Sequence, residues 1–207
     1  SGENDPDAQL AMGLWCARMR LDGGRTAAGA GSANFRKAIR WLTLAGEQGR
    51  AEAWYALSRI YVKPEFSQRN VSVAQRYLEQ AAGMGYRAAQ LECGNNAWRA
   101  RRENESNDVR AVFWLQKAAA QGCLEAGAAL RRIAPRDTAR QAGLDAALSR
   151  AHPLLAARLE LAAMFGLSRA EALLLDVSRA DCGHCLVVDI RSSYGRSKRR
   201  LVMVETA

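Results

Sequence analysis

The sequence predicts an all-α fold: an α-α superhelix (solenoid) of antiparallel helix pairs, followed by a small C-terminal helical segment and a β-hairpin. The main observation is a repeat every 36 to 37 residues, marked by Ala38, Ala74 and Ala111. A second ladder of small residues interleaves with the first and consists of Ala8, Ala53, Ala89 and Ala126. A fixed period of this length with two helical patterns per unit is typical of stacked helix pairs, because a single pair cannot bury its own apolar face.

Each unit is predicted to contain a helix A, a loop and a helix B. In the second unit, helix A places Ala53, Leu57 and Ile60 on one face, at the spacing i, i+4 and i+7. Helix B of the same unit places Ala74 and Leu78 on its apolar face. An aromatic–leucine pair recurs in every helix B: Trp41-Leu42, Tyr77-Leu78 and Trp114-Leu115.

Small residues are predicted to shape the helix ends and the helix contacts. Each helix B is followed by a glycine, which is Gly49, Gly85 or Gly122. Just past a helix end the backbone often takes a positive φ, which glycine adopts without a Cβ clash. Small residues also recur inside helix A, at Gly13, Ser58 and Gly94. These positions predict a close approach of neighbouring helices, since a bulky side chain there would push them apart.

The combined pattern resembles the Sel-one-like repeat family, whose repeat is a relative of the tetratricopeptide repeat. It reads Ala-x-x-x-Leu-Gly-x-x-Tyr, a variable loop, and Lys-Ala-x-x-Trp-x-x-x-Ala-x-x-x-Gly. Three copies occur in phase, and 126–133 resembles the first helix of an incomplete fourth. Cys16 and Ala97 depart from the tyrosine, and Ser58 departs from the glycine. The resemblance covers residues 8–134 and implies an α-solenoid that acts in protein–protein interaction.

Residues 135–207 do not follow the period and are expected to form C-terminal helices and a β-hairpin. Segments 138–150 and 153–165 each carry an Ala/Leu face and predict two helices. Ser168 and Glu171 have the spacing of a capping box, which predicts a further helix from Ser168 to about Ala180.

Two β-rich runs, 185–190 and 200–205, flank a turn that contains Gly195 and predict the hairpin. Basic residues cluster at its tip and form a candidate contact for an anionic partner: Arg191, Arg196, Lys198, Arg199 and Arg200. Together with the break at Gly166 before the capped helix, this arrangement suggests a winged helix-turn-helix and an alternative function in nucleic-acid binding. However, a recognition helix needs exposed polar side chains, whereas Leu173, Leu174 and Leu175 require burial. We therefore favour the protein-binding function.

The resemblance implies a partner-binding groove lined by one face of each helix A. Carried over by position, this face consists of Leu10, Leu14, Tyr55, Arg59, Leu91, Asn95 and Trp98. The mixture of aromatic, apolar and hydrogen-bonding side chains is typical of protein interfaces, and the expected partner is a protein or peptide. The alternative is that several of these residues pack beneath the C-terminal helices, which then fold back into the groove.

The motif Cys182-Gly-His-Cys185 equals the active-site tetrapeptide of protein disulfide isomerases. There the reactive cysteine lies at a helix N-terminus, which lowers its pKa, whereas here a strand is predicted to follow the motif. A zinc site needs about four ligands, and His152 is the remaining histidine. We interpret the motif as a turn into the hairpin. The sequence thus predicts no catalytic residue, no metal and no cofactor.

Composition fits an interaction protein that does not insert into a membrane. No run approaches the roughly 18 apolar residues of a membrane helix. The net charge of +9 is spread along the chain and suits an acidic partner without forming a nucleic-acid footprint. Five cysteines favour the reducing cytoplasm over a disulfide framework. Ser1-Gly2 resembles a scar of tag removal, which leaves a periplasmic or membrane-anchored full-length protein open.

Overall fold

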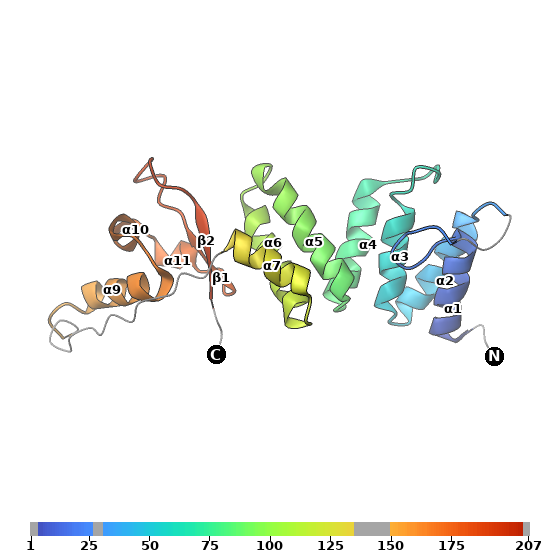
Figure 1. The fold of residues 1–207 in the computed structure, drawn as a ribbon, viewed down its shortest axis with the longest axis horizontal. Helices are drawn as coiled ribbons and strands as arrows, with labels where there is room; N and C mark the ends of the chain where they lie inside the picture. Colours follow the sequence, from blue (N-terminus) through green and yellow to red (C-terminus); the bar gives the residue numbers. More distant parts are fainter. Residues whose placement is uncertain (1–3, 27–30, 135–149, 205–207) are drawn as a thin grey trace.

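The computed structural model describes residues 4–26, 31–134 and 150–204. Its helices follow one another along an elongated array, with the C-terminal elements at one end (Figure 1). The array comprises α1 (Pro6–Ala17), α2 (Phe35–Glu47), α3 (Ala51–Ile60), α4 (Val71–Gly83), α5 (Arg87–Arg99), a 3-10 turn (Ala100–Arg102), α6 (Ser106–Ala120) and α7 (Leu124–Ile133). The C-terminal elements are α9 (Pro153–Phe165), α10 (Arg169–Leu174), α11 (Val177–Ala180), β1 (Cys185–Val188) and β2 (Arg200–Met203). The predicted all-α solenoid with a short hairpin is confirmed.

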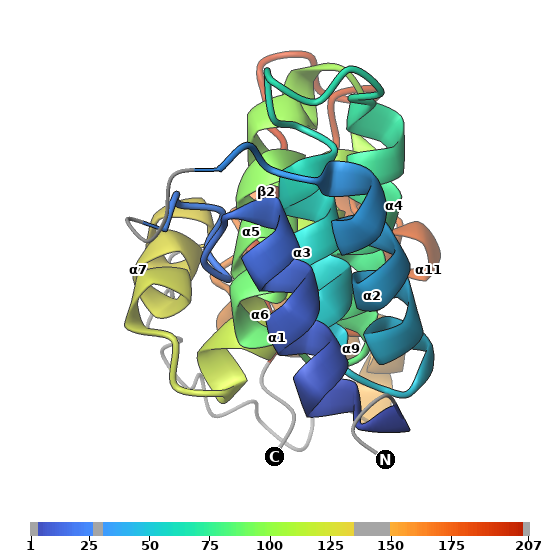
Figure 2. The same cartoon turned by 90° about the vertical axis from the view of Figure 1, so that its right-hand side faces the viewer.

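Each helix from α1 to α7 packs on the next one in the chain. Seen along the array from its N-terminal end, α2 and α4 lie to one side of α1 and α3 (Figure 2). One continuous apolar cluster joins helices α1 to α5. The repeated aromatic residues Trp41, Tyr77 and Trp114 all pack against this cluster, so they contribute to the same core. The repeat period therefore corresponds to one seam of buried side chains.

A recurring cap ends every helix B. At the end of α4, Gly85 has φ 92°, and its amide donates to the Ala82 carbonyl at 3.0 Å. The next amide, of Tyr86, donates to the Ala81 carbonyl at 3.0 Å. These two bonds define a Schellman motif, which satisfies carbonyls that the helix leaves unpaired. The same motif closes α2 and α6, where φ is 95° at Gly49 and 80° at Gly122.

Glycine also sets the distance between the two helices of a pair. A Cβ at Gly13 in α1 would lie 2.6 Å from Leu42 Cγ of α2. A Cβ at Gly94 in α5 would lie equally close, at 2.6 Å, to Leu115 Cγ of α6. In both pairs the leucine of helix B therefore rests on the backbone of helix A. In the middle repeat Ser58 occupies this position, and its hydroxyl is fully buried and donates to a backbone carbonyl at 2.6 Å.

The hairpin covers the C-terminal end of the array. Strands β1 and β2 are antiparallel, with Cys185 opposite Met203. Val187 and Leu201 join a buried cluster with Val112 and Leu115 of α6. Helices α9 to α11 lie beyond the hairpin, away from α1 to α5 (Figure 1). Among the described residues, the C-terminal helices thus extend the array rather than fold back along helices A.

The C-terminal helices differ in part from their sequence predictions. Helix α9 matches the predicted segment 153–165, whereas 138–150 lies almost wholly outside the described residues. The capping box at Ser168 is present, but the helix ends at Leu174 and α11 follows after a break. Leu175 is extended (ψ 125°) and buried. Asp176 then caps α11, because its carboxylate accepts from the Ser178 amide at 3.2 Å.

We expect Gly94→Ala to lower the free energy of unfolding by about 1–3 kcal/mol, because the new methyl group overlaps Leu115 and separates α5 from α6. Gly83→Ala is the matched control, since a Cβ there meets no atom within 4 Å. Alanine at this helical position should be neutral or stabilising by less than about 1 kcal/mol. Urea unfolding followed by circular dichroism measures both variants. Equal effects at the two positions would contradict the packing argument.

Candidate functional site

The aliphatic residues of the predicted groove serve the core as well as the surface. Leu10 and Leu14 of α1 are partly buried and pack against the cluster that joins α1 to α5. Leu91 of α5 is also partly buried and packs against the cluster beneath the hairpin. These three side chains are therefore partly exposed, with their remaining surface in the core.

Tyr55 and Arg59 of α3 are joined by Glu92 of α5, a residue that the sequence analysis did not identify. Arg59 forms an ion pair with Glu92 at 2.6 Å, and the Tyr55 hydroxyl donates to the same carboxylate at 3.3 Å. The Tyr55 ring packs on Tyr86 with a centroid distance of 5.0 Å. We call these four residues the Tyr55 cluster. The sequence did contain a signal for Glu92. The equivalent position of α1 is an alanine, Ala11, so the carboxylate at residue 92 departs from the repeat.

Tyr55 is buried, and the polar groups of Tyr55, Arg59 and Glu92 pair with one another. Tyr55 is 8% exposed, and this burial, reinforced by Glu92, raises the pKa of its hydroxyl to about 12. The cluster links α3 to α5 across helices A. An ion pair of 2.8 Å between Arg110 and Glu79 links α6 to α4, the helices B of the same two repeats. Tyr55 therefore stabilises the array, and little of it is available to a partner.

The C-terminal half of α5 has more capacity for binding. Trp98 is partly buried, and the Arg101 guanidinium lies 4.3 Å from its ring centroid. Arg101 also donates to the Trp98 carbonyl at 2.8 Å. Asn95, one turn earlier, is partly exposed, and no hydrogen bond found among the described residues uses its side chain. An aromatic ring, a cation and an amide thus lie on one short stretch of the surface.

Three of the five basic hairpin residues are held by carboxylates. Arg199 pairs with Asp108 of α6 at 2.9 Å, and the hydrogen bond raises the pKa of its guanidinium. Arg191 contacts both Asp189 and Glu105 at 2.7 Å. The hydrogen bond from Arg191 lowers the pKa of Asp189 strongly.

The third residue, Arg200, pairs with Glu171 at 3.0 Å and lowers the pKa of that carboxyl through hydrogen bonding. Glu171 also completes the capping box of α10, whose N-cap residue is Ser168, so this pair joins α10 to the hairpin. Arg196 and Lys198 are exposed at the tip, and the described residues provide no partner for either. The basic cluster is therefore mostly an internal network that fixes the hairpin.

The Cys182–Cys185 motif forms a turn. The Cys182 amide donates to the Cys185 carbonyl at 3.0 Å, and Gly183 has φ 76°. Cys185 is fully buried, which raises the pKa of its thiol to about 12. Such a thiol forms little of the reactive thiolate. Within the described ranges, the cysteines are all unpaired and no three His, Cys, Asp or Glu side chains gather as metal ligands would.

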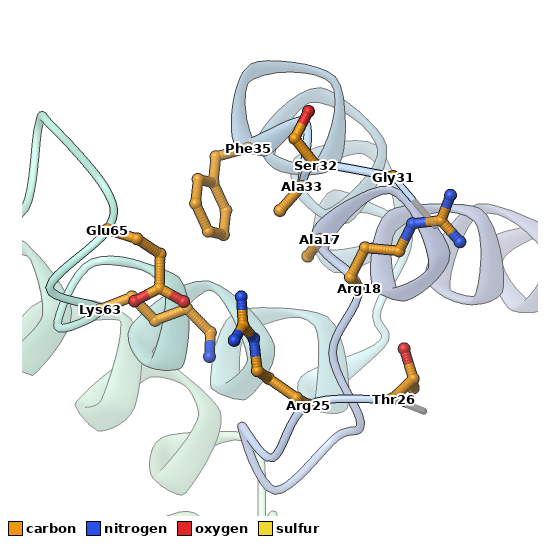
Figure 3. Close-up of a pocket in the computed structure, with 10 residues that line it drawn as sticks. All are labelled: Ala17, Arg18, Arg25, Thr26, Gly31, Ser32, Ala33, Phe35, Lys63 and Glu65. Carbon is orange, nitrogen blue, oxygen red and sulfur yellow. The ribbon is translucent and has the colours of Figure 1, made fainter. Parts of the chain in front are cut away.

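A polar cavity of about 470 Å³ lies between the loops that follow α1 and α3. Arg25 extends toward Lys63 and Glu65, whereas the Arg18 guanidinium points away from them (Figure 3). Lys63 is partly engaged, because its ammonium donates to the Gly23 carbonyl at 2.9 Å. The lining contains no histidine or cysteine, the side chains that most often serve as general base or activated thiol nucleophile.

Comparisons with known proteins identify the repeats. The Sel1 repeat family model matches residues 6–49, 51–86 and 105–123. The third match covers α6 but not α5, the helix that carries Glu92 and Asn95. In the part of the chain that the structure describes, no helix combines the length and apolar character needed to span a bilayer.

Among solved structures, the chain is similar to a Sel1 repeat protein from Oxalobacter formigenes. The two share 24% sequence identity with a TM-score of 0.51, over 76% of this chain. The chain spans 60% of the length of that protein. At this identity the likeness shows the fold alone. No curated protein matches the chain significantly.

We expect Tyr55→Ala to lower the free energy of unfolding by about 3–5 kcal/mol, because it removes a buried ring and leaves a cavity. Tyr55→Phe keeps the ring and removes the hydroxyl that donates to Glu92, so it should cost only about 1 kcal/mol. Thermal and urea unfolding measure both. A small effect of Tyr55→Ala would show that the ring is not part of the core.

Acid should loosen the attachment of the hairpin. Arg200 and Arg191 lower the pKa of Glu171 and Asp189, so the folded protein binds these protons less tightly than the unfolded chain does. This stabilisation is fully present above pH 4.5, the ordinary pKa of glutamate, and is lost as the pH falls below it. Hydrogen exchange of β1 and β2 amides should therefore accelerate in acid. In Glu171→Gln part of this pH dependence should disappear, and an unchanged profile would contradict the assignment.

Proposed function

We propose that the chain is a scaffold or adaptor protein. The proposal rests on the segments 6–49, 51–86 and 105–123, which match the Sel1 repeat, a non-catalytic repeat that generally mediates protein–protein interaction. The chain holds a peptide or helix of a partner protein in the groove along helices A. Residues 8–134 form the binding array in this proposal, and residues 135–207 form its C-terminal cap.

The observation that carries the proposal is the surface of α5 around Asn95 and Trp98. An unpaired amide can accept and donate hydrogen bonds to a peptide backbone. A partly exposed tryptophan with an arginine stacked on it is the kind of anchor that dominates interface energies. The surface lies on α5, which is outside the segments that the family model matches.

The remaining groove residues have supporting roles in this proposal. The Tyr55 cluster keeps α3 and α5 at a fixed distance, so the α5 surface is organised before the partner binds. Preorganisation of this kind reduces the entropy lost on binding. Leu10, Leu14 and Leu91 provide apolar contact along the groove.

Nucleic-acid binding is less well supported. Arg191, Arg199 and Arg200 are engaged with carboxylates, and each would have to leave its partner to contact phosphate. Arg196 and Lys198 alone offer few charges, whereas affinity for nucleic acid grows with the number of phosphates neutralised. We therefore do not assign this function to the hairpin.

We expect Asn95→Ala combined with Trp98→Ala to weaken partner binding by more than about 2 kcal/mol, roughly 30-fold. The partner is first recovered by pull-down from the source cell lysate, and its affinity is then measured by titration calorimetry. The control is Arg40→Ala with Leu44→Ala, two exposed positions of α2 outside the groove. Both variants should keep the wild-type helicity. Unchanged affinity of the α5 variant would refute the groove assignment.

A further inference from the structure

A pocket opens between three consecutive helices in the middle of the array, α4, α5 and α6. Its walls include Gln75 of α4, Asn96 and Ala97 of α5, and Asn107 and Trp114 of α6. The pocket has a volume of about 210 Å³, whereas a cavity of roughly 150 Å³ is enough to hold a benzene ring. These five residues all keep partial exposure, so the pocket is reached from solvent. We call it the Ala97 pocket.

The preceding repeat shows what normally fills this position. There Tyr61 follows α3, and its ring centroid lies 5.6 Å from that of Tyr77 on α4. One repeat later, Ala97 replaces Tyr61 and Trp114 replaces Tyr77. The third repeat therefore keeps the aromatic ring of helix B but lacks the ring of helix A that packs on it. The Ala97 pocket lies where that ring is missing.

The first repeat lacks the same tyrosine but does not leave it open. Cys16 replaces the tyrosine there and is only 4% exposed. Ala97, in contrast, keeps partial exposure. Loss of the tyrosine thus coincides with an accessible wall in the third repeat and with a closed one in the first.

A second departure from the repeat supplies polar groups to the pocket. Asn34 and Asn70 cap α2 and α4, and each accepts a backbone amide with its side-chain oxygen. Asn107 holds the same position in the third repeat, but α6 already begins at Ser106. The Asn107 side-chain amide donates instead to the Ala100 carbonyl at 3.0 Å. Within the described ranges, nothing donates to its side-chain oxygen, which remains available as an acceptor.

We propose that the Ala97 pocket binds a phenol ring from outside the chain. The ring packs on Trp114 and reproduces the contact of Tyr61 with Tyr77. Aromatic pairs of this kind are favourable at centroid distances of roughly 4.5–7 Å. The phenol hydroxyl donates to the free oxygen of Asn107. The ring belongs either to a tyrosine of a partner protein or to a small phenolic compound, and both present the same chemistry.

The charges beside the pocket suit a neutral ligand. Arg110 and Glu79 also line it and form an ion pair with each other at 2.8 Å, so the phenol needs to displace neither. The pocket lies on the opposite side of α5 from Asn95 and Trp98, because residues 96, 97 and 100 are about half a helical turn away from them. The inference is therefore independent of the proposed groove.

Titration with p-cresol, the tyrosine side chain as a free molecule, tests the proposal on the unmodified protein. Two-dimensional NMR should give a dissociation constant on the order of 1 mM, as expected for so small a ligand. The shifted amides should surround Ala97. Toluene has the ring without the hydroxyl and should bind about 5-fold more weakly, since it cannot donate to Asn107. Absence of p-cresol binding at roughly 20 mM overturns the proposal, and equal affinity for toluene overturns the choice of a phenol.

Ala97→Tyr restores the missing ring within the chain. It should weaken p-cresol binding by about 10-fold or more and raise the midpoint of thermal unfolding by roughly 2–4 °C. The control is Ala120→Tyr, which adds the same ring at an exposed position at the other end of α6 and should change neither quantity. Circular dichroism confirms that both variants keep their helicity. A lower midpoint for Ala97→Tyr, or p-cresol binding that survives in it, contradicts the pocket assignment.

The same titration with N-acetyl-tyrosinamide identifies the carrier of the ring. In this compound the phenol is attached to a peptide backbone. Binding as tight as that of p-cresol supports a tyrosine of a partner protein. Weaker binding supports a small phenolic compound, because the backbone then does not fit at the pocket entrance.

Discussion

The structure depends on a single constraint, the contact of a helix B leucine with the backbone of helix A. Gly13 and Gly94 allow this contact in the first and third repeats, and Ser58 replaces glycine in the second. Because the helices approach so closely, the small residues on the neighbouring faces are fully buried. No pair achieves this alone, since part of its apolar surface is covered by the next pair. The stacking of the repeats follows from this spacing.

Much of the fold could be predicted because the constraint is periodic in sequence. The ladders of alanine located helices A and B, and the terminal glycines located the positive-φ caps that the structure confirms. The capping box at Ser168 was also predicted correctly, because it depends on two residues that are only three apart in the sequence. The sequence could not predict where α10, the helix that begins at this capping box, would end. Its break at Leu175 depends on burial of that side chain against the hairpin region, a contact that is distant in sequence.

The candidate site was less predictable than the fold. Position along helix A predicted which residues face a groove, but it could not show that Tyr55 is buried by Tyr86 and bound by Glu92. Nor could it show that hairpin arginines are neutralised by acids from other elements, such as Asp108 on α6. Whether a polar side chain is free to bind depends on its partners in space. Only the three-dimensional arrangement distinguishes Asn95 from Arg59 in this respect.

The paired links between the second and third repeats have a mechanical consequence. Arg59 and Glu92 join helices A there, and Arg110 and Glu79 join helices B of the same step. In a solenoid, every junction between neighbouring repeats contributes to the flexibility of the array. A junction with one ion pair between its helices A and another between its helices B resists changes of pitch. Elastic strain imposed by a bound partner would then concentrate in the neighbouring steps, while the surface of α5 keeps its shape.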